Sequence, residues 1–283
     1  MDGLQLDYGF LDNFKLRLFG GGDVTYYEGY NAEDLIVGTE LSGRFLESLS
    51  LGLSYLQKWE DGDLSHELIG LDVDYDFLNL LNVYNETQYS WLTEEVTYFL
   101  VGANYHRSSD WSLRAEYLYS LPVFSATSIY SVFAVDEYQE LMAELNYRID
   151  IGLRAFGRYT REMYESFDDA NVFEAGIEKI RTDHFSGYLV GTVRDDSDGQ
   201  DLYGVKVRAA WLFNRYFETG IGAHVDVLER RLEEDDETTS SRVWVDGTAF
   251  VSKTVNVQAK VERIESDLWD EYYRGRVRLN ILF

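Results

Sequence analysis

The chain lacks cysteine, contains a single proline, and has no long apolar run. The absence of cysteine excludes disulfide frameworks, thiol nucleophiles, cysteine metal sites and CxxCH haem attachment in this chain. A transmembrane helix needs about 20 mostly apolar residues in succession. The apolar runs here are only a few residues long, although 45% of the 283 residues are hydrophobic and 16% are aromatic. The chain is therefore expected to fold, but without membrane-spanning helices.

Histidine and clustered basic residues are also scarce. The four histidines are dispersed along the chain: His66, His106, His184 and His224. Only His224 shares a face with nearby acids, Glu218 and Asp226, and no serine nucleophile with a matching base can be identified. We therefore expect no enzyme activity, no catalytic residue and no cofactor. Metal binding stays open, since residues 195–201 bring oxygen ligands together but lack the complete calcium-loop pattern.

The charge balance is strongly acidic. The chain has 51 Asp and Glu residues against 25 Lys and Arg residues, which gives a net charge of -26, and it has no basic block. A nucleic-acid partner is excluded, because phosphate binding requires a basic surface.

The N-terminal residues Met1 to Leu6 have neither the basic region nor the apolar core of a secretory signal. Either a signal has been removed or the protein was never secreted, and the rest of the sequence favours the first explanation. An alternating stretch from Leu4 to Phe10 makes residues 1–13 an N-terminal extension or an extra strand. Residues 14–283 are interpreted as one domain.

From about residue 33 onward, the chain alternates apolar and polar residues with a period of two, which is typical of strands. In the segment 241–251, Val243, Val245 and Ala249 face one way, whereas Arg242 and Asp246 face the other. The same pattern predicts strands near 14–26, 34–44, 49–59, 66–77, 82–91, 95–106, 111–121, 138–148, 151–161, 172–180, 184–194, 202–212, 217–227, 255–261 and 271–283. The total is about 16, with about 14 to 18 possible.

The connections between these segments alternate in length. Short turns such as 45–48 and 213–216 are predicted at one end of the strands, and longer loops such as 59–65 and 229–241 at the other. This arrangement, with charges on one face and aromatic residues near the ends of the other, is typical of a transmembrane β-barrel. A soluble β-sandwich is the alternative. We predict an all-β fold, a transmembrane antiparallel up-and-down β-barrel.

The last segment resembles the closing strand of bacterial outer-membrane β-barrel proteins of the porin-like superfamily, although no particular family is identified. Such a strand ends in an aromatic residue with apolar residues at alternate positions before it: Phe283, Ile281, Leu279 and Tyr273. The resemblance implies that these residues form an assembly signal read by the barrel assembly machinery. It also implies a location in the bacterial outer membrane, in contact with its lipid and lipopolysaccharide.

Charges in the polar register are predicted to line a wet lumen. A basic stripe joins the first and last barrel strands and consists of Lys15, Arg17, Arg274, Arg276 and Arg278. An acidic stripe consists of Asp72, Asp74 and Asp76. Opposed stripes would create a transverse field, whereas the alternative is that these residues form ion pairs across strands.

An external acidic loop is predicted at Glu233, Glu234, Asp235, Asp236 and Glu237. It would enrich cations at the mouth and oppose the basic stripe, which predicts weak cation selectivity. The predicted function is a porin-like channel for passive diffusion of small hydrophilic solutes or ions. The alternative is a barrel scaffold. It would dock a periplasmic partner, or a cytochrome as part of an electron conduit, or it would form a polysaccharide export pore.

Overall fold

The structure is a computed structural model that describes residues 2–22, 31–107, 109–121, 137–166, 168–196, 201–229, 237–267 and 269–281. These residues form seventeen strands of one sheet. None of the described residues belong to a helix that is long and apolar enough to cross a membrane. The strands fall into two compact units, which are described separately.

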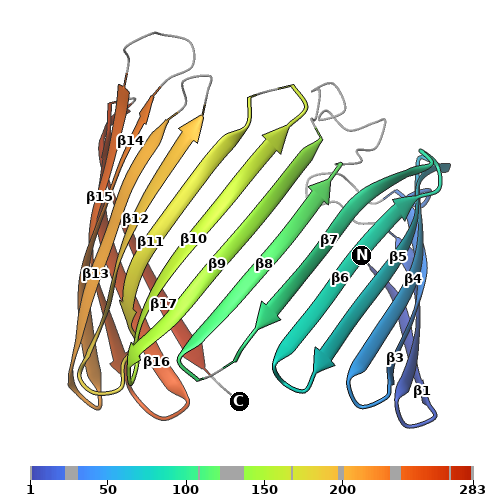
Figure 1. The fold of residues 1–283 in the computed structure, drawn as a ribbon, viewed down its shortest axis with the longest axis horizontal. Helices are drawn as coiled ribbons and strands as arrows, with labels where there is room; N and C mark the ends of the chain where they lie inside the picture. The colour runs from blue at the N-terminus through green and yellow to red at the C-terminus, as the bar shows by residue number, and fades with distance from the viewer. Residues whose placement is uncertain are drawn as a thin grey trace. The chain divides into compact units, whose positions relative to one another are not determined.

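The first unit comprises residues 1–107, 114–142 and 163–166. Its complete strands are β1 (Asp2–Phe10), β2 (Phe14–Gly22), β3 (Leu35–Phe45), β4 (Leu49–Glu60), β5 (Asp63–Phe77), β6 (Leu81–Ser90) and β7 (Glu95–Tyr105), and it shares β8 (Trp111–Ser120) and β9 (Tyr138–Asp150) with the second unit. From β1 to β7, each strand pairs antiparallel with the next in the chain. The up-and-down course of these strands can be followed in Figure 1.

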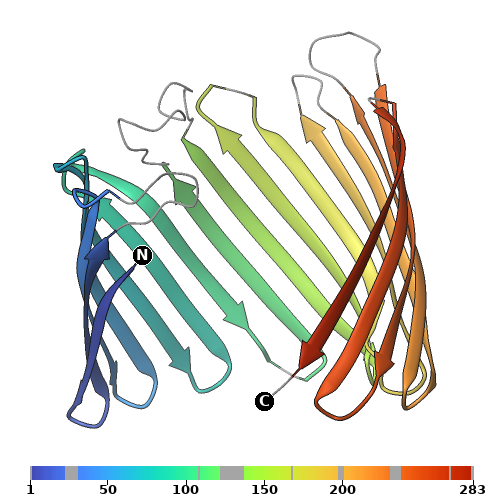
Figure 2. The same cartoon turned by 180° about the vertical axis from the view of Figure 1, so that it is seen from behind.

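The second unit comprises residues 108–113, 143–162 and 167–283. Its strands are β10 (Leu153–Tyr164), whose last two residues belong to the first unit, β11 (Ala170–Lys179), β12 (Phe185–Asp196), β13 (Leu202–Asn214), β14 (Phe217–Glu229), β15 (Glu237–Phe250), β16 (Val255–Ser266) and β17 (Trp269–Ile281). Each strand again pairs antiparallel with its neighbour in sequence. Figure 2 shows this unit from behind.

Every segment predicted as a strand contains one, and the Leu4 to Phe10 stretch supplies the seventeenth. Strand β1 pairs with β2 along its whole length, from Asp2 opposite Gly22 to Phe10 opposite Phe14. The structure therefore has one strand more than the 16 predicted, within the range of about 14 to 18 that the sequence allowed.

The prediction of a long loop at residues 59–65 is wrong. Strand β4 runs to Glu60 and β5 begins at Asp63, so the connection is a tight hairpin turn. Asp61 and Gly62 both have positive φ angles, 50° and 81°, and an Asp-Gly pair is the preferred sequence for such a turn. The local Asp-Gly signal thus outweighs the run of acidic residues that indicated a loop.

Alternation gives each unit a charged face and an apolar face. On β13, Lys206 and Arg208 lie on the charged face, with Val207 between them on the apolar face. The large residues of the apolar face are mostly exposed: Leu189 by 51% and Ile221 by 58%. A soluble sandwich would bury these residues in its core, whereas a lipid-facing surface leaves them outside.

Aromatic residues border this apolar face in the second unit. At the short-turn end lie Phe185, Trp211, Phe213 and Phe217, with the rings of Phe213 and Phe217 stacked at 6.0 Å between centroids. Toward the other end, the rings of Tyr159 and Phe173 lie 4.9 Å apart. Such bands match the aromatic girdles that lie at lipid headgroup level in membrane barrels.

Candidate functional site

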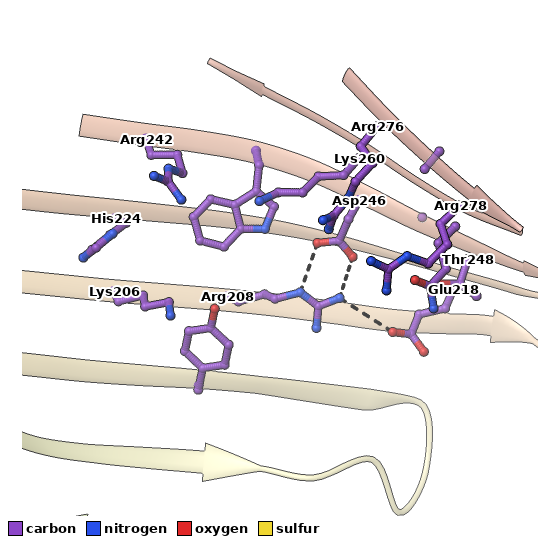
Figure 3. A pocket seen from close by; sticks show the side chains of 15 residues that line it. Lys206, Arg208, Glu218, His224, Arg242, Asp246, Thr248, Lys260, Arg276 and Arg278 are labelled. Atoms are coloured by element: carbon purple, nitrogen blue, oxygen red, sulfur yellow. Dashed lines mark hydrogen bonds and ion pairs between the residues drawn. The ribbon is translucent and has the colours of Figure 1, made fainter. Parts of the chain in front are cut away.

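The charged face of the second unit contains an open recess of about 600 Å³. Its wall is formed by residues of β12 to β17, and Figure 3 shows the side chains. The charged members are Lys206, Arg208, Glu218, His224, Arg242, Asp246, Lys260, Arg276 and Arg278, and Tyr188 and Trp244 add aromatic rings. Six Lys or Arg side chains thus face two carboxylates around one solvent-filled space.

An ion pair occupies the floor of the recess. The Arg208 guanidinium donates two hydrogen bonds to Asp246, at 3.0 Å from Nε and 2.5 Å from Nη2. Its Nη2 also lies 3.7 Å from Glu218 Oε1, so the guanidinium sits between two carboxylates (Figure 3). This bidentate arrangement neutralises Arg208 and fixes its orientation.

Two glycines of β14 make room for these contacts. Arg208 on β13 reaches Asp246 on β15 across Gly220, where a Cβ atom would lie 2.8 Å from the Arg208 Nη2 atom. At Gly222, a Cβ atom would meet Cζ2 of Trp244 at 2.2 Å. Trp244 is only 6% exposed, so its ring fills the space that the missing side chain leaves.

The substitution Gly222→Ala is expected to destabilise the fold by about 1–3 kcal/mol, because the Trp244 ring would have to move out of a well-packed position. Denaturant unfolding followed by tryptophan fluorescence measures the change. Gly157→Ala on β10 is the matched control, since a Cβ atom there has no neighbour within 4 Å. Equal stability of the two variants would contradict this account of Gly222.

A second group of ion pairs joins two cations, Lys260 and Arg274, to the carboxylate of Glu262. The Lys260 Nζ atom lies 2.7 Å from Glu262 Oε2 and stands over the Trp244 ring, 4.7 Å from its centroid. Arg274 Nε donates to Glu262 Oε1 at 2.5 Å. Glu262 is 3% exposed, so it is a buried carboxylate that forms ion pairs with two cations.

Four cations of the recess have no such partner. Within the described part of the chain, no carboxylate lies within 4.0 Å of the charged groups of Lys206, Arg242, Arg276 and Arg278. Lys206 lies over the Tyr188 ring, 5.5 Å from its centroid. The Nε atom of Arg242 is buried without a hydrogen-bond partner among those residues.

Farther along the charged face, a second recess of about 430 Å³ lies over β10 to β14 and shares Tyr188, Lys206 and His224 with the first. Here the charges are matched: Arg158 lies 2.5 Å from Glu144 and 3.0 Å from Glu174. The excess of positive charge is therefore a feature of the first recess and not of the second.

The predicted acidic stripe lies on the charged face of the first unit. Asp74 accepts a hydrogen bond from Asn82 Nδ2 at 3.1 Å, and Asp76 accepts one from the Asn79 backbone N–H at 2.8 Å. Asp72 pairs in register with another acid, Glu86. No ion pair joins the three aspartates to a cation in the described ranges, so cross-strand pairing does not account for them.

The five residues of the predicted basic stripe have different surroundings. In the first unit, Lys15 lies 3.3 Å from Asp7, and Arg17 contacts Asp7 at 3.0 Å and Glu40 at 2.8 Å. In the second unit, Arg274 is paired with Glu262, whereas Arg276 and Arg278 line the recess. The stripe as a whole joins residues of both units and stays a prediction.

Two further predicted sites lie partly outside the described residues. In the assembly signal, Tyr273, Leu279 and Ile281 are exposed on the apolar face of β17, and Phe283 lies outside those residues. In the external acidic loop, only Glu237 is described, and it opens β15 opposite Glu229. Among the described side chains, no group of three or more His, Asp or Glu residues could hold a metal ion. Residues 197–200 of the oxygen-rich stretch are not described.

Sequence reasoning placed Arg242, Trp244 and Asp246 in the polar register but did not single them out. The available signal was the pair of glycines, Gly220 and Gly222, at alternate positions of the neighbouring strand, which indicates close approach by large side chains. Their partners could not be named, because that requires the register between strands.

Comparison with known proteins shows the fold. No protein-family model and no curated protein matches the sequence. Among solved structures, OccK9 (OpdG) of Pseudomonas aeruginosa has a TM-score of 0.64 and 12% identity, covering 98% of this chain and 88% of that one. OccK3 (OpdO) of the same organism has a TM-score of 0.63 and 10% identity, covering 95% and 89%.

A third similar structure is Wzi of Escherichia coli, described as an outer membrane protein involved in group 1 capsule assembly and a carbohydrate-binding β-barrel. It has a TM-score of 0.56 and 11% identity, covering 99% of this chain and 78% of that one. At these identities the likeness concerns the fold alone, which is that of the bacterial outer-membrane β-barrels. The predicted fold class is confirmed, and with the exposed apolar face so is the outer-membrane location.

Proposed function

We propose that the protein is a porin-like outer-membrane channel through which small hydrophilic solutes diffuse passively. The observation that carries this proposal is the recess of about 600 Å³ on the charged face, with four cations that lack carboxylate partners. Unpaired charges are too costly to bury away from water. They are therefore expected to face an aqueous interior, as in wide barrels that leave a channel open.

The unpaired charges also bear on selectivity. The predicted weak cation selectivity depends on acidic loops at the mouth, and the recess opposes it from within. Loop charges in bulk water are screened over about 8 Å at physiological salt, whereas charges in a confined lumen are screened less. The predicted cation preference should accordingly fade as salt rises.

The test is conductance of the purified protein in a planar lipid bilayer. We expect stepwise increases in current, each from insertion of one channel, because water fills the charged interior. The same protein unfolded by heating serves as the control and should give no steps. A folded, membrane-inserted protein that conducts no current would overturn the channel proposal and favour the scaffold, as a polysaccharide export pore or a docking barrel.

A further inference from the structure

We propose that the recess on β12 to β17 binds a multivalent oxyanion, a small solute with two or more carboxylate or phosphate groups. The proposal deepens the proposed function, because it names a class of solute, and it rests on the charged face being the aqueous interior. The binding groups are the four cations without carboxylate partners: Lys206, Arg242, Arg276 and Arg278.

The first argument is the balance of charge within the recess. Arg208 is paired with Asp246 at 2.5 Å, and Lys260 is paired with Glu262 at 2.7 Å, a carboxylate that Arg274 also contacts. Their negative partners are thus already engaged and do not serve the remaining cations. Four like charges around one open space repel one another, and an anion placed among them relieves that repulsion.

The second argument is an orphaned donor. The Arg242 Nε–H is buried and has no hydrogen-bond partner in the described part of the chain. A buried donor without an acceptor costs about 1–3 kcal/mol. A ligand oxygen at this wall would supply the missing acceptor, which no nearby side chain does.

The register shows how the cations are spaced. Lys206, His224 and Arg242 lie side by side on β13, β14 and β15. Adjacent strands are about 4.8 Å apart, so the backbones at Lys206 and Arg242 are about 10 Å apart. Arg276 and Arg278 lie about 7 Å apart on the same face of β17. Figure 3 shows Lys206 and Arg242 toward one side of the Arg208 pair and Arg278 toward the other, with Arg276 beside its register partner Lys260.

This spacing favours a multivalent ligand. A guanidinium presents a planar fork of donors that fits a carboxylate or phosphate through two hydrogen bonds. A monovalent anion would satisfy one such fork and leave the others unpaired. A solute with several anionic groups can engage more than one, and a recess of about 600 Å³ has room for a small one.

The experiment measures binding of citrate and of inorganic pyrophosphate to the detergent-solubilised protein by titration calorimetry at low salt, with a neutral trisaccharide as comparison. We expect one or both anions to bind and the sugar not to. The double variant Arg276→Gln and Arg278→Gln should weaken binding about 100-fold, since it removes two charge-assisted contacts. Arg276→Lys with Arg278→Lys keeps the charge and should restore part of the affinity.

Arg154→Gln is the matched control, because Arg154 lies on the same charged face but is paired with Glu178 at 2.5 Å. It should leave the affinity unchanged. Heat-modifiable gel mobility shows whether each variant is folded. Binding of neither anion to the wild type, or equal weakening in the control, would overturn the proposal. A barrel that conducts no current but binds citrate would overturn only the channel proposal. A barrel that conducts current but binds neither anion would overturn only the proposal of an anion site.

Discussion

Replacing Glu262 with glutamine is expected to make the proposed channel markedly more anion-selective. The Glu262 carboxylate forms ion pairs with both Lys260, at 2.7 Å, and Arg274, at 2.5 Å. The amide keeps the shape of the side chain but not its charge. Two further cations would then join the four that already lack carboxylate partners, all on the same face of β13 to β17.

The same substitution should also lower stability. Glu262 is 3% exposed, and replacing one of its carboxylate oxygens with an NH2 group removes the negative charge beside two cations, which is expected to cost about 1–3 kcal/mol. Because Lys260 lines the open recess and Arg274 is largely exposed, we expect the barrel to remain folded. The change in unfolding free energy can be measured in denaturant.

Selectivity is measured as the reversal potential across a potassium chloride gradient, at low and at high salt. The shift toward anions should persist at high salt, because charges in a confined lumen are poorly screened. Glu265→Gln is the control, since Glu265 lies on the other face of β16 and pairs with Arg263 at 2.8 Å. A reversal potential that Glu262→Gln leaves unchanged would show that this part of the charged face does not line the conducting path.

The strands could be predicted from the sequence because a period of two is a local property. Strand β13 alternates Val205, Lys206, Val207 and Arg208, and each side chain is assigned to a face without knowledge of its neighbours. Exposure of the apolar face was predicted from the aromatic residues near strand ends, a pattern that has a physical reason only in a membrane. The structure has both features.

The pairing of charges could not be predicted in the same way. Arg208 on β13 forms an ion pair with Asp246 on β15, two strands away. This contact depends on the register of three strands and on the glycine at position 220. From the sequence, Arg274, Arg276 and Arg278 were likewise predicted to be equivalent members of one basic stripe. Only Arg274 lies opposite an acid, Glu262, whereas Arg276 lies opposite Lys260. A shift of one residue in register would exchange the faces of the whole strand.

The assignment of the two faces can be tested by introducing an arginine on each face of one strand in turn. Leu189 lies on the apolar face of β12, beside Ile177 and Val207. It is four residues, about 13 Å, from Phe185 at the short-turn end of the strand. This position is near the middle of the apolar band, where an arginine would have to enter the hydrocarbon core.

Leu189→Arg is therefore expected to lower the unfolding free energy in lipid bilayers by about 2–4 kcal/mol, the cost of arginine near the bilayer midplane of a membrane barrel. Thr192→Arg is the comparison: Thr192 is on the charged face of the same strand, opposite Glu174. There the guanidinium stays in water beside a carboxylate, and the loss should be below about 1 kcal/mol. Denaturant titration of both variants in vesicles gives the difference. Equal losses, or a larger loss for Thr192→Arg, would mean that the apolar face of β12 does not meet lipid. The charged face could then no longer be taken as the interior on which the proposed channel depends.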